Sequence, residues 1–310
     1  MGISQLNTFI NQQCKDHIQT HPLSVLKKKK IVIDVQVYMY MFLCGSGTLM
    51  ENMFILCTQF ITHEITPLFI FDGRKTAVAN KTDKRNQRKE VRNQVLDSAT
   101  LSPDKIISET KFQYLKRQVV RVTNAQIAQI KQLIQSFGFT CIDAIGEADE
   151  ICAHASITNK SCECLSEDTD MFAYGCMKIF RNLNITNQTI TLVNVAGILN
   201  QLNMTLDEMR EVCALSSNDY NCKQENIPSV FHVMEQFQEF KNQNQNQNQP
   251  FYEWYMEKNE FKNDDLFKEI YNIYDVFSQA VPLSNIPFTN SPVNHKQVQT
   301  IMEEEGFYYM

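Results

Sequence analysis

The sequence predicts an α/β fold with a mostly parallel central sheet, followed by an α-helical C-terminal part. Two observations predict it: short apolar runs that stop shortly before acidic residues, and stretches of helical periodicity between these runs. Apolar runs of this length are typical of strands buried on both faces of a parallel sheet. Strands that alternate with helices require crossover connections, which characterise the α/β class.

The strands are expected where the apolar runs lie. Four runs carry the main argument, and two later strands should be joined by a polar turn at residues 182–188. The expected strands are residues 30–33, 67–71, 139–142, 162–165, 177–180 and 189–193.

The clearest helix is expected at residues 124–137. Thr123 should cap its N-terminus, and Gly138 should end it. Its apolar side chains recur at intervals of three and four residues, so they share one face of the helix. These side chains are Ile127, Ile130, Leu133, Ile134 and Phe137.

The C-terminal part is expected to be helical. Helices are predicted at residues 206–215, 264–277 and 293–304. Residues 241–250 alternate Asn and Gln and end in Pro, a low-complexity pattern that predicts a disordered loop. We therefore divide the chain into a core at residues 1–220 and a helical region at residues 221–310.

Composition narrows the class of protein. The chain has 310 residues, of which 43% are hydrophobic, so it can bury a sizeable core. No apolar run reaches the ~18 residues that a membrane helix needs, and the N-terminus lacks a secretory signal. The ten cysteines form no Cys-x-x-Cys pair. We expect reduced, mostly buried thiols in an intracellular reducing compartment, with no zinc site and no membrane partner.

The charge is distributed unevenly along the chain. The net charge is −6, yet residues 73–121 hold 13 Lys and Arg against 5 Asp and Glu. Within an expected helix, Lys81, Arg85, Arg88 and Arg92 recur at three and four and share one face. A basic segment on an acidic body predicts a local phosphate-binding surface, although a merely solvated helix would show the same pattern.

Acidic residues follow the expected strands and one expected helix. In a parallel α/β sheet, functional side chains lie beyond the carboxyl ends of the strands. Each acid alone is weak evidence, because Asp is common in turns. The seven acids in such positions are Asp34, Asp72, Glu147, Asp149, Asp168, Asp170 and Asp219.

Convergence of these acids would require cations. Two carboxylates ~4 Å apart repel by about 4 kcal/mol at an effective dielectric near 20. Oxygen ligands select Mg²⁺, for which Mn²⁺ can substitute, over zinc. Two such ions would activate a water and stabilise a leaving oxygen in phosphodiester hydrolysis. If the acids are instead dispersed caps and turns, no metal site follows, and spacing alone leaves both readings open.

Several motifs occur in the order in which the flap endonuclease/XPG family of 5′ nucleases carries them. Met1-Gly2-Ile3 resembles the family's N-terminus, whose glycine lies near the active site. Ile31-Val32-Ile33-Asp34 and Phe69-Ile70-Phe71-Asp72-Gly73 resemble its first two acidic motifs. Residues 117–123, Glu147-Ala148-Asp149, residues 166–170 and Asp219-Tyr220 are similar to the later ones. The resemblance runs from Met1 to about Tyr220.

The resemblance implies a PIN-like 5′-nuclease core with a helical arch at about residues 74–121. It also implies two-Mg²⁺ hydrolysis of DNA at a single-strand/duplex junction, with the seven acids holding or orienting the ions. Lys81 and Arg85 would approach the scissile phosphate; the local spacing differs from the family, so Lys84 or Arg88 could take either role. Tyr40 would stack on a base, and Gly2 and Arg92 would lie along the DNA. We expect a monomer that acts in a nucleus or at a viral replication site.

The sequence also departs from the family's pattern. Ser217 stands two residues before the last acid, where the family usually has Gly, and a positive φ there would strain Ser. The family's hairpin that grips duplex phosphate around a K⁺ ion contains glycines, but residues 226–229 contain none, which argues against K⁺. The short interval from Asp34 to Asp72 argues against a pocket for a 3′ flap. No sliding-clamp motif follows Gln299.

Three functions stay open at this point. The leading hypothesis is a Mg²⁺-dependent structure-specific 5′ nuclease in DNA replication, repair or recombination. A 5′→3′ exoribonuclease shares the acidic core, although such proteins are usually much longer. A catalytically inactive scaffold that binds DNA or a protein is the third, but it would not need seven mutually repelling carboxylates.

Overall fold

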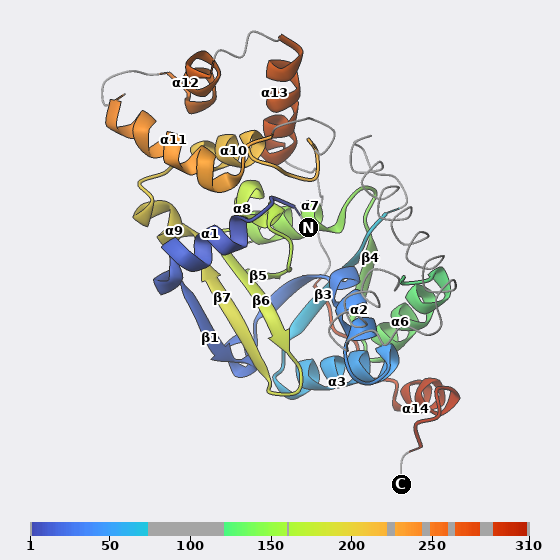
Figure 1. Cartoon of the computed structure of the whole chain (residues 1–310). Coiled ribbons are helices and arrows are strands. Elements are labelled where there is room, and N and C mark those ends of the chain that lie inside the picture. Colours follow the sequence, from blue (N-terminus) through green and yellow to red (C-terminus); the bar gives the residue numbers. More distant parts are fainter. Residues whose placement is uncertain are drawn as a thin grey trace, which may run out of the picture. The chain divides into compact units, whose positions relative to one another are not determined.

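The computed structural model of the chain (Figure 1) describes most of the predicted elements. It describes residues 2–73, 121–159, 161–221, 227–243, 249–259, 264–279 and 288–308. Five predicted DNA-contacting residues lie outside this part, as does the predicted arch up to residue 120. These residues are Lys81, Lys84, Arg85, Arg88 and Arg92.

The described residues form an α/β fold, as predicted, with two compact units. The first unit comprises Met1–Leu23, Asp149–Asn184 and Gln188–Asn285, and the second comprises Ser24–Ala148, Ile185–Asn187 and Ile286–Met310. Each unit is therefore assembled from segments that are distant in the sequence. The expected division of the chain near residue 220 stays a prediction.

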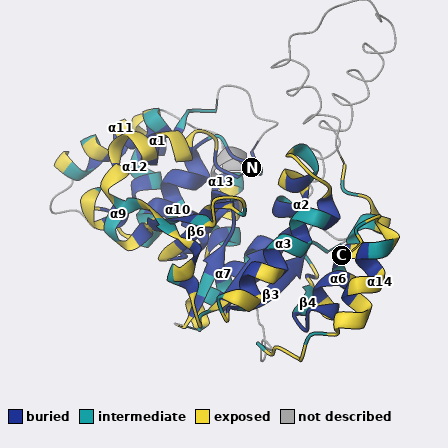
Figure 2. Ribbon diagram, turned by 90° about the horizontal axis from the view of Figure 1, so that it is seen from below, coloured by how far each residue is buried: buried dark blue, intermediate teal, exposed yellow. Residues whose placement is uncertain are grey.

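Among its described residues, the second unit contains three parallel strands in the order β2-β3-β4. They are β2 (Lys30–Asp34), β3 (Thr66–Phe71) and β4 (Thr140–Asp143). Figure 2 shows β3 almost wholly in the colour of buried residues, since helices cover it and only Thr66 is half-exposed. The helices of this unit are α2 (Val35–Cys44), α3 (Leu49–Thr62), α6 (Asn124–Ser136) and α14 (His295–Glu304).

Helix α6 begins as predicted and ends at Ser136, one residue before its predicted end, with Phe137 rather than Gly138 as its C-cap. The Thr123 hydroxyl accepts the Gln126 backbone N–H at 3.2 Å, and the Gln126 side chain accepts the Thr123 N–H at 2.9 Å, a reciprocal capping box. After the helix, Gly138 has a φ of +81° and its N–H reaches the Gln135 carbonyl at 2.9 Å. A left-handed residue at this point favours glycine, so the chain can turn directly into β4.

The part of the first unit that the structure describes contains four strands in the order β1-β7-β6-β5. They are β1 (Ile18–Pro22), β5 (Cys162–Leu165), β6 (Lys178–Asn184) and β7 (Thr189–Asn194). β5 and β6 are parallel, whereas β7 is antiparallel to both β6 and β1. β6 runs past its predicted end at Phe180, with a register shift between Arg181 and Asn184, so the predicted turn is shorter.

The helices described for the first unit include most of the described C-terminal part (Figure 1). They are α1 (Leu6–Gln13), α7 (Ala148–Thr158), α8 (Asp170–Tyr174), α9 (Val195–Gln201), α10 (Leu206–Leu215), α11 (Val230–Gln243), α12 (Phe251–Lys258) and α13 (Asp264–Ser278). Two 3-10 turns, η1 (Lys15–His17) and η2 (Leu23–Leu26), flank β1.

Residues 241–243 correct one prediction. They were expected to open the low-complexity loop, but they form the last turn of α11. The Lys241 ammonium binds both carboxylate oxygens of Glu208, at 3.0 and 3.3 Å, and Phe237 and Phe240 bury the apolar face of the same helix. These tertiary contacts outweigh the polar composition of the segment.

Two further predictions concern burial. Most of the cysteines that the structure describes are buried, as predicted, Cys14, Cys57 and Cys164 among them, and none of these described cysteines forms a disulfide. None of the described helices combines the length and the apolar character that crossing a bilayer demands.

Candidate metal centre

Three of the seven predicted acids meet in the first unit. Asp149 lies in the first turn of α7, Asp168 in the loop after β5, and Asp170 at the start of α8. Their side chains each offer an oxygen, and these oxygens all lie within 4.8 Å of one another. All three are buried, with exposed fractions of 5%, 8% and 0%. We call Asp149, Asp168 and Asp170 the acid triad.

The charge of the acid triad is concentrated. Two carboxylates 4.8 Å apart repel by about 3 kcal/mol at an effective dielectric near 20. The positive ends of α7 and α8 offset part of this, because the N-terminal turn of a helix favours negative charge. Burial raises the pKa of Tyr174 well above its usual value, and the nearby Asp149 carboxylate raises it further. A divalent cation would relieve the repulsion, and hard oxygen donors suit Mg²⁺ and Mn²⁺.

The loop that carries Asp168 and Asp170 is held by its own side chains. The Asp168 N–H donates to the Ser166 hydroxyl at 3.1 Å, and the Asp170 N–H donates to an Asp168 carboxylate oxygen at 3.1 Å. Glu167, which directly precedes Asp168, contacts other residues. Its carboxylate accepts the Asn182 N–H at 2.6 Å and lies 3.8 Å from the buried Arg181 guanidinium. Alternation of side chains along the loop thus separates Glu167 from the acid triad.

Gly2 lies against the same loop. Its φ is +82°, and a Cβ there would lie within 2.6 Å of oxygens of Asp168, Thr169 and Asp170. Any side chain at this position would therefore collide with the acid triad. Only a glycine lets the backbone approach so closely, which is the position that the resemblance implied for Gly2.

Asp219 lies within a turn that two asparagines build. The Asn218 side-chain amide donates to the Cys213 and Ser216 carbonyls, both at 2.9 Å, and its oxygen accepts the Tyr220 N–H at 2.8 Å. The Asn221 side chain accepts the Asn218 N–H at 2.9 Å. Both asparagines are buried, while Asp219 between them is half-buried. The hydrogen bonds of Asn218 and Asn221 therefore hold the backbone on both sides of Asp219.

Tyr220 and Tyr174 tie this turn to α8. Their hydroxyls lie 3.2 Å apart, and both rings pack edge-on against Phe277 of α13, with centroids 5.5 Å away. Asp219 and Asp170 thus sit on elements that share one aromatic contact.

Ser217 does not show the strain that a serine in place of glycine was expected to cause. It is not among the described residues with positive φ, so its side chain meets no left-handed backbone. Its N–H donates to the Pro228 carbonyl at 3.0 Å, and its carbonyl accepts the Ser4 N–H at 2.7 Å. Serine at this position is therefore accommodated without left-handed backbone strain.

The second unit carries three of the other predicted acids. Asp34 ends β2 and is 6% exposed, and Asp72 follows β3. Asp72 accepts the Ala148 N–H at 2.9 Å, which holds it beside the segment that carries the half-buried Glu147. Gly73 supports this arrangement, since its N–H donates to the Gly146 carbonyl at 2.9 Å and a Cβ would collide with the Ala144 carbonyl. Tyr40 lies on α2 and is 38% exposed.

Some residues that build the site were not predicted. Thr169, Asn218 and Asn221 contribute hydrogen bonds that place the acids, but none of them is itself an acid. A local signal existed for one: Asn218 directly precedes an acid after a helix end, and Asn side chains commonly bond to backbone groups two residues on.

Comparisons with known proteins agree with this geometry. The XPG N-terminal domain matches residues 1–95, and the XPG I-region matches residues 138–219. Together the two matches span more than half of the chain. The chain belongs to the XPG family. The I-region match contains Asp149, Asp168, Asp170 and Asp219, and the N-terminal match contains Asp34 and Asp72.

Individual relatives are distant in sequence. Flap endonuclease 1 of Cryptosporidium parvum is 26% identical over 253 residues, which cover 71% of this chain and 50% of that protein. A probable RAD2-like endonuclease, 369L, of Invertebrate iridescent virus 6 is 26% identical over 279 residues, which cover 71% of this chain and 67% of that protein. The XPG chain therefore spans only half to two thirds of the length of these relatives.

The solved structure of the catalytic core of Rad2 in complex with DNA substrate has the same fold. It superposes with a TM-score of 0.69 at 21% identity, over 97% of this chain and 95% of that one. At this identity the likeness concerns the fold alone.

Proposed function

We propose that this XPG chain is a Mg²⁺-dependent 5′ nuclease that cleaves DNA at single-strand/duplex junctions. The observation that carries the proposal is the buried acid triad, whose oxygens lie within 4.8 Å of one another in the I-region of an XPG chain. The names of its relatives, flap endonuclease and RAD2-like endonuclease, support the same activity.

The donor set fits divalent ions. Mg²⁺ binds oxygen at ~2.1 Å, so two ligands on opposite sides of one ion lie ~4.2 Å apart, close to the spacing in the acid triad. The donors are carboxylates without thiolate or imidazole, which disfavours zinc. Mn²⁺ would substitute for Mg²⁺.

When bound, two divalent ions would supply an activated water and stabilise the leaving 3′ oxygen. The acid triad would hold the ions directly, and the other four acids would complete the set directly or through water. These four are Asp34, Asp72, Glu147 and Asp219. Lys81 and Arg85, or Lys84 and Arg88 in their place, would bind the scissile phosphate. The exposed ring of Tyr40 would stack on a base.

The test removes two charges from the acid triad. Asp168→Asn plus Asp170→Asn keeps the size of both side chains and the acceptor for the Asp170 N–H. Cleavage of a 5′-flap DNA in Mg²⁺ should fall by on the order of 10³-fold or more, because the ions lose two ligands. Cleavage rates measured on flap, nicked, gapped and hairpin DNA would also define the preferred structure.

Glu167→Gln is the matched control. It changes an acid to an amide one residue away, but Glu167 contacts Asn182 and Arg181 rather than the acid triad. It should keep most of the activity. Undiminished cleavage by the double variant would disprove the site, and a wild-type chain that cuts only 5′-ended RNA would point to the exoribonuclease. Localisation, monomeric state, and the absence of K⁺ and of a clamp motif stay predictions.

A further inference from the structure

Thr169 makes a contact that its local position does not explain. It is the N-cap residue of α8, where threonine usually accepts a hydrogen bond from its own helix, yet it makes no side-chain cap. Its hydroxyl is directed at Ile3 instead. It accepts the Ile3 N–H at 2.7 Å and donates to the Ile3 carbonyl at 3.3 Å. One hydroxyl thus satisfies both backbone groups of a residue that is 3% exposed.

The next residue of the chain binds the other acidic loop. The Ser4 N–H donates to the Ser217 carbonyl at 2.7 Å, two residues before Asp219. Ile3 and Ser4 therefore contact two loops in succession: the one that carries Asp168 and Asp170, and the one that carries Asp219. Gly2, one residue earlier, already lies against the acid triad without room for a side chain.

We propose that Thr169 is a positioning residue, whose hydroxyl docks residues 2–4 between the two acidic loops and thereby fixes the spacing of the carboxylates that bind metal. The expected change in cleavage kinetics rests on the proposed function, whereas the expected docking of residues 2–4 does not. Thr169 lies between Asp168 and Asp170 in sequence, so any shift of its backbone moves both acids.

Loss of the hydroxyl has a defined physical result. Valine has the shape of threonine, but it would leave the buried Ile3 N–H and carbonyl without their partner, a costly state that favours release of the segment. The two acidic loops would then lose their common support. Residues that orient metal ligands typically change metal affinity or activity by 10–100-fold when mutated, and we expect a loss of about that size.

The experiment compares three single variants of the full chain. Thr169→Val removes the hydroxyl, Thr169→Ser keeps it, and Thr191→Val removes a different buried hydroxyl of the same unit, which contacts Thr20 at 3.3 Å. Three quantities are measured on each: amide hydrogen exchange of residues 2–13, Mn²⁺ affinity by calorimetry, and kcat and KM on 5′-flap DNA. Circular dichroism establishes that each variant is folded.

Thr169→Val should speed exchange of the Ile3 and Ser4 amides and weaken Mn²⁺ binding by about 10–100-fold. It should lower kcat more than it changes KM, whereas Thr169→Ser and Thr191→Val should resemble the wild type. Wild-type exchange and Mn²⁺ affinity in Thr169→Val would overturn the proposal. A Thr169→Ser variant with faster exchange of the Ile3 and Ser4 amides and weaker Mn²⁺ binding than the wild type would also overturn it, because serine keeps the hydroxyl. This second test remains available if Thr169→Val fails to fold.

Failure of the proposed function gives a different pattern. A wild-type chain that binds Mn²⁺ but cuts no nucleic acid would disprove the nuclease. The exchange and affinity measurements would still decide the role of Thr169.

Discussion

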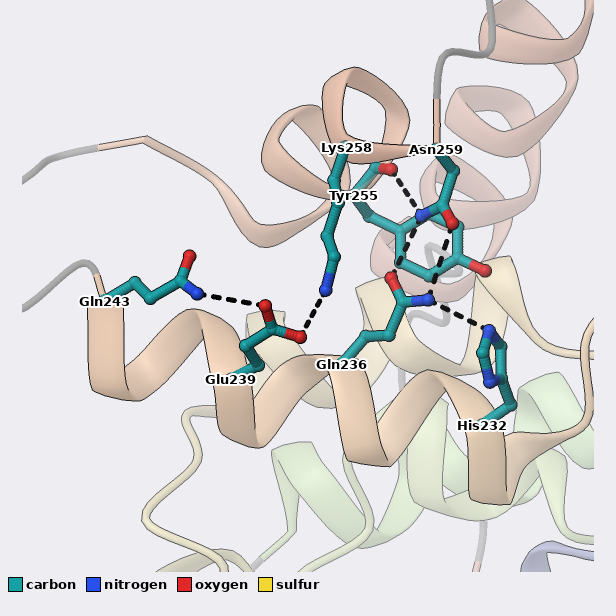
Figure 3. Close-up of polar contacts among 7 residues, drawn as sticks. All are labelled: His232, Gln236, Glu239, Gln243, Tyr255, Lys258 and Asn259. Carbon is teal, nitrogen blue, oxygen red and sulfur yellow. Dashed lines mark hydrogen bonds and ion pairs between the residues drawn. The ribbon is translucent and has the colours of Figure 1, made fainter.

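Two polar clusters of the first unit differ in the charges that they bring together. Between α11 and α12, complementary groups face one another (Figure 3): the Asn259 amide donates to the Gln236 oxygen at 2.9 Å, and Glu239 binds the Lys258 ammonium. The Gln243 amide donates to Glu239 at 2.9 Å on the same face. In the acid triad, three carboxylates of the same charge lie close together, and all three residues are buried.

The difference shows what each cluster is for. Paired groups between α11 and α12 stabilise the packing of two helices, and this needs no ligand. Like charges in the acid triad oppose folding, a cost that the proposed binding of divalent ions would offset. The comparison can be tested by changing, in turn, the divalent metal, the pH and the side-chain contacts between α11 and α12.

The largest effect on stability should come from the metal. Mg²⁺ or Mn²⁺ at about 100 times its dissociation constant should raise the free energy of unfolding by about 2.7 kcal/mol relative to EDTA, because only the folded chain brings the acids together. Asp168→Asn plus Asp170→Asn should lose this gain and, in EDTA, unfold no more easily than the wild type. Thermal unfolding followed by circular dichroism measures both, and equal metal stabilisation of the two proteins would contradict the comparison.

A buried acid near α12 should give the next largest effect. Glu211 of α10 accepts the Tyr252 N–H at 3.0 Å, and burial raises its pKa to about 7. Because the pKa is higher in the folded chain than in the unfolded one, the stability from protonated Glu211 is full below about pH 4.5 and is lost as the pH rises through about 7.

Glu211→Gln keeps the acceptor for Tyr252 without this titration. The variant should match the wild type near pH 5 and exceed it by about 2 kcal/mol at pH 8, after allowance for solvent screening. Urea unfolding in EDTA at several pH values between 5 and 8 would show the divergence. Parallel curves for the two proteins would refute a titrating Glu211.

The smallest effects should come from the α11–α12 contact. Gln236→Ala leaves the Asn259 amide, which also donates to the Tyr255 carbonyl, short of one partner, and should cost about 1–2 kcal/mol. Lys258→Gln on the facing helix removes an exposed ion pair and should change the unfolding midpoint much less. Neither variant should alter Mg²⁺-dependent cleavage. Reduced cleavage by a folded Gln236→Ala would contradict the view that the α11–α12 contact only stabilises helix packing.

Local patterns predicted those parts of the fold that local forces determine. β2, β3 and β5 coincide with apolar runs, and α6 begins at the predicted capping threonine. β1 was missed, because Ile18–Pro22 is an edge strand of the described sheet whose residues are half-exposed or exposed, so it carries few apolar side chains. The last turn of α11 was missed for the reverse reason, since a distant Glu208 holds Lys241.

The sequence indicated the acids of the candidate site, but it did not indicate the residues that hold these acids in place. The acids of the triad stand near strand ends, where a parallel sheet collects functional groups, so their positions made them candidates, while the family resemblance implied that they act together. Thr169 and Ser217 act through backbone contacts with Ile3 and Ser4, and nothing in either local sequence reveals a partner so far along the chain. The basic residues expected to face the phosphate lie outside the described part.

The contact between Ile3 and Thr169 spans 166 positions of the sequence. During synthesis at ~5–20 residues per second, the first residues must wait roughly 8–30 s before the threonine that docks them has been made, and longer for Ser217. A contact between residues so far apart in sequence also has a large loop-closure cost, which slows folding. A ribosome-bound chain therefore carries its acids unassembled, and the centre gains its geometry only when most of the protein has been made.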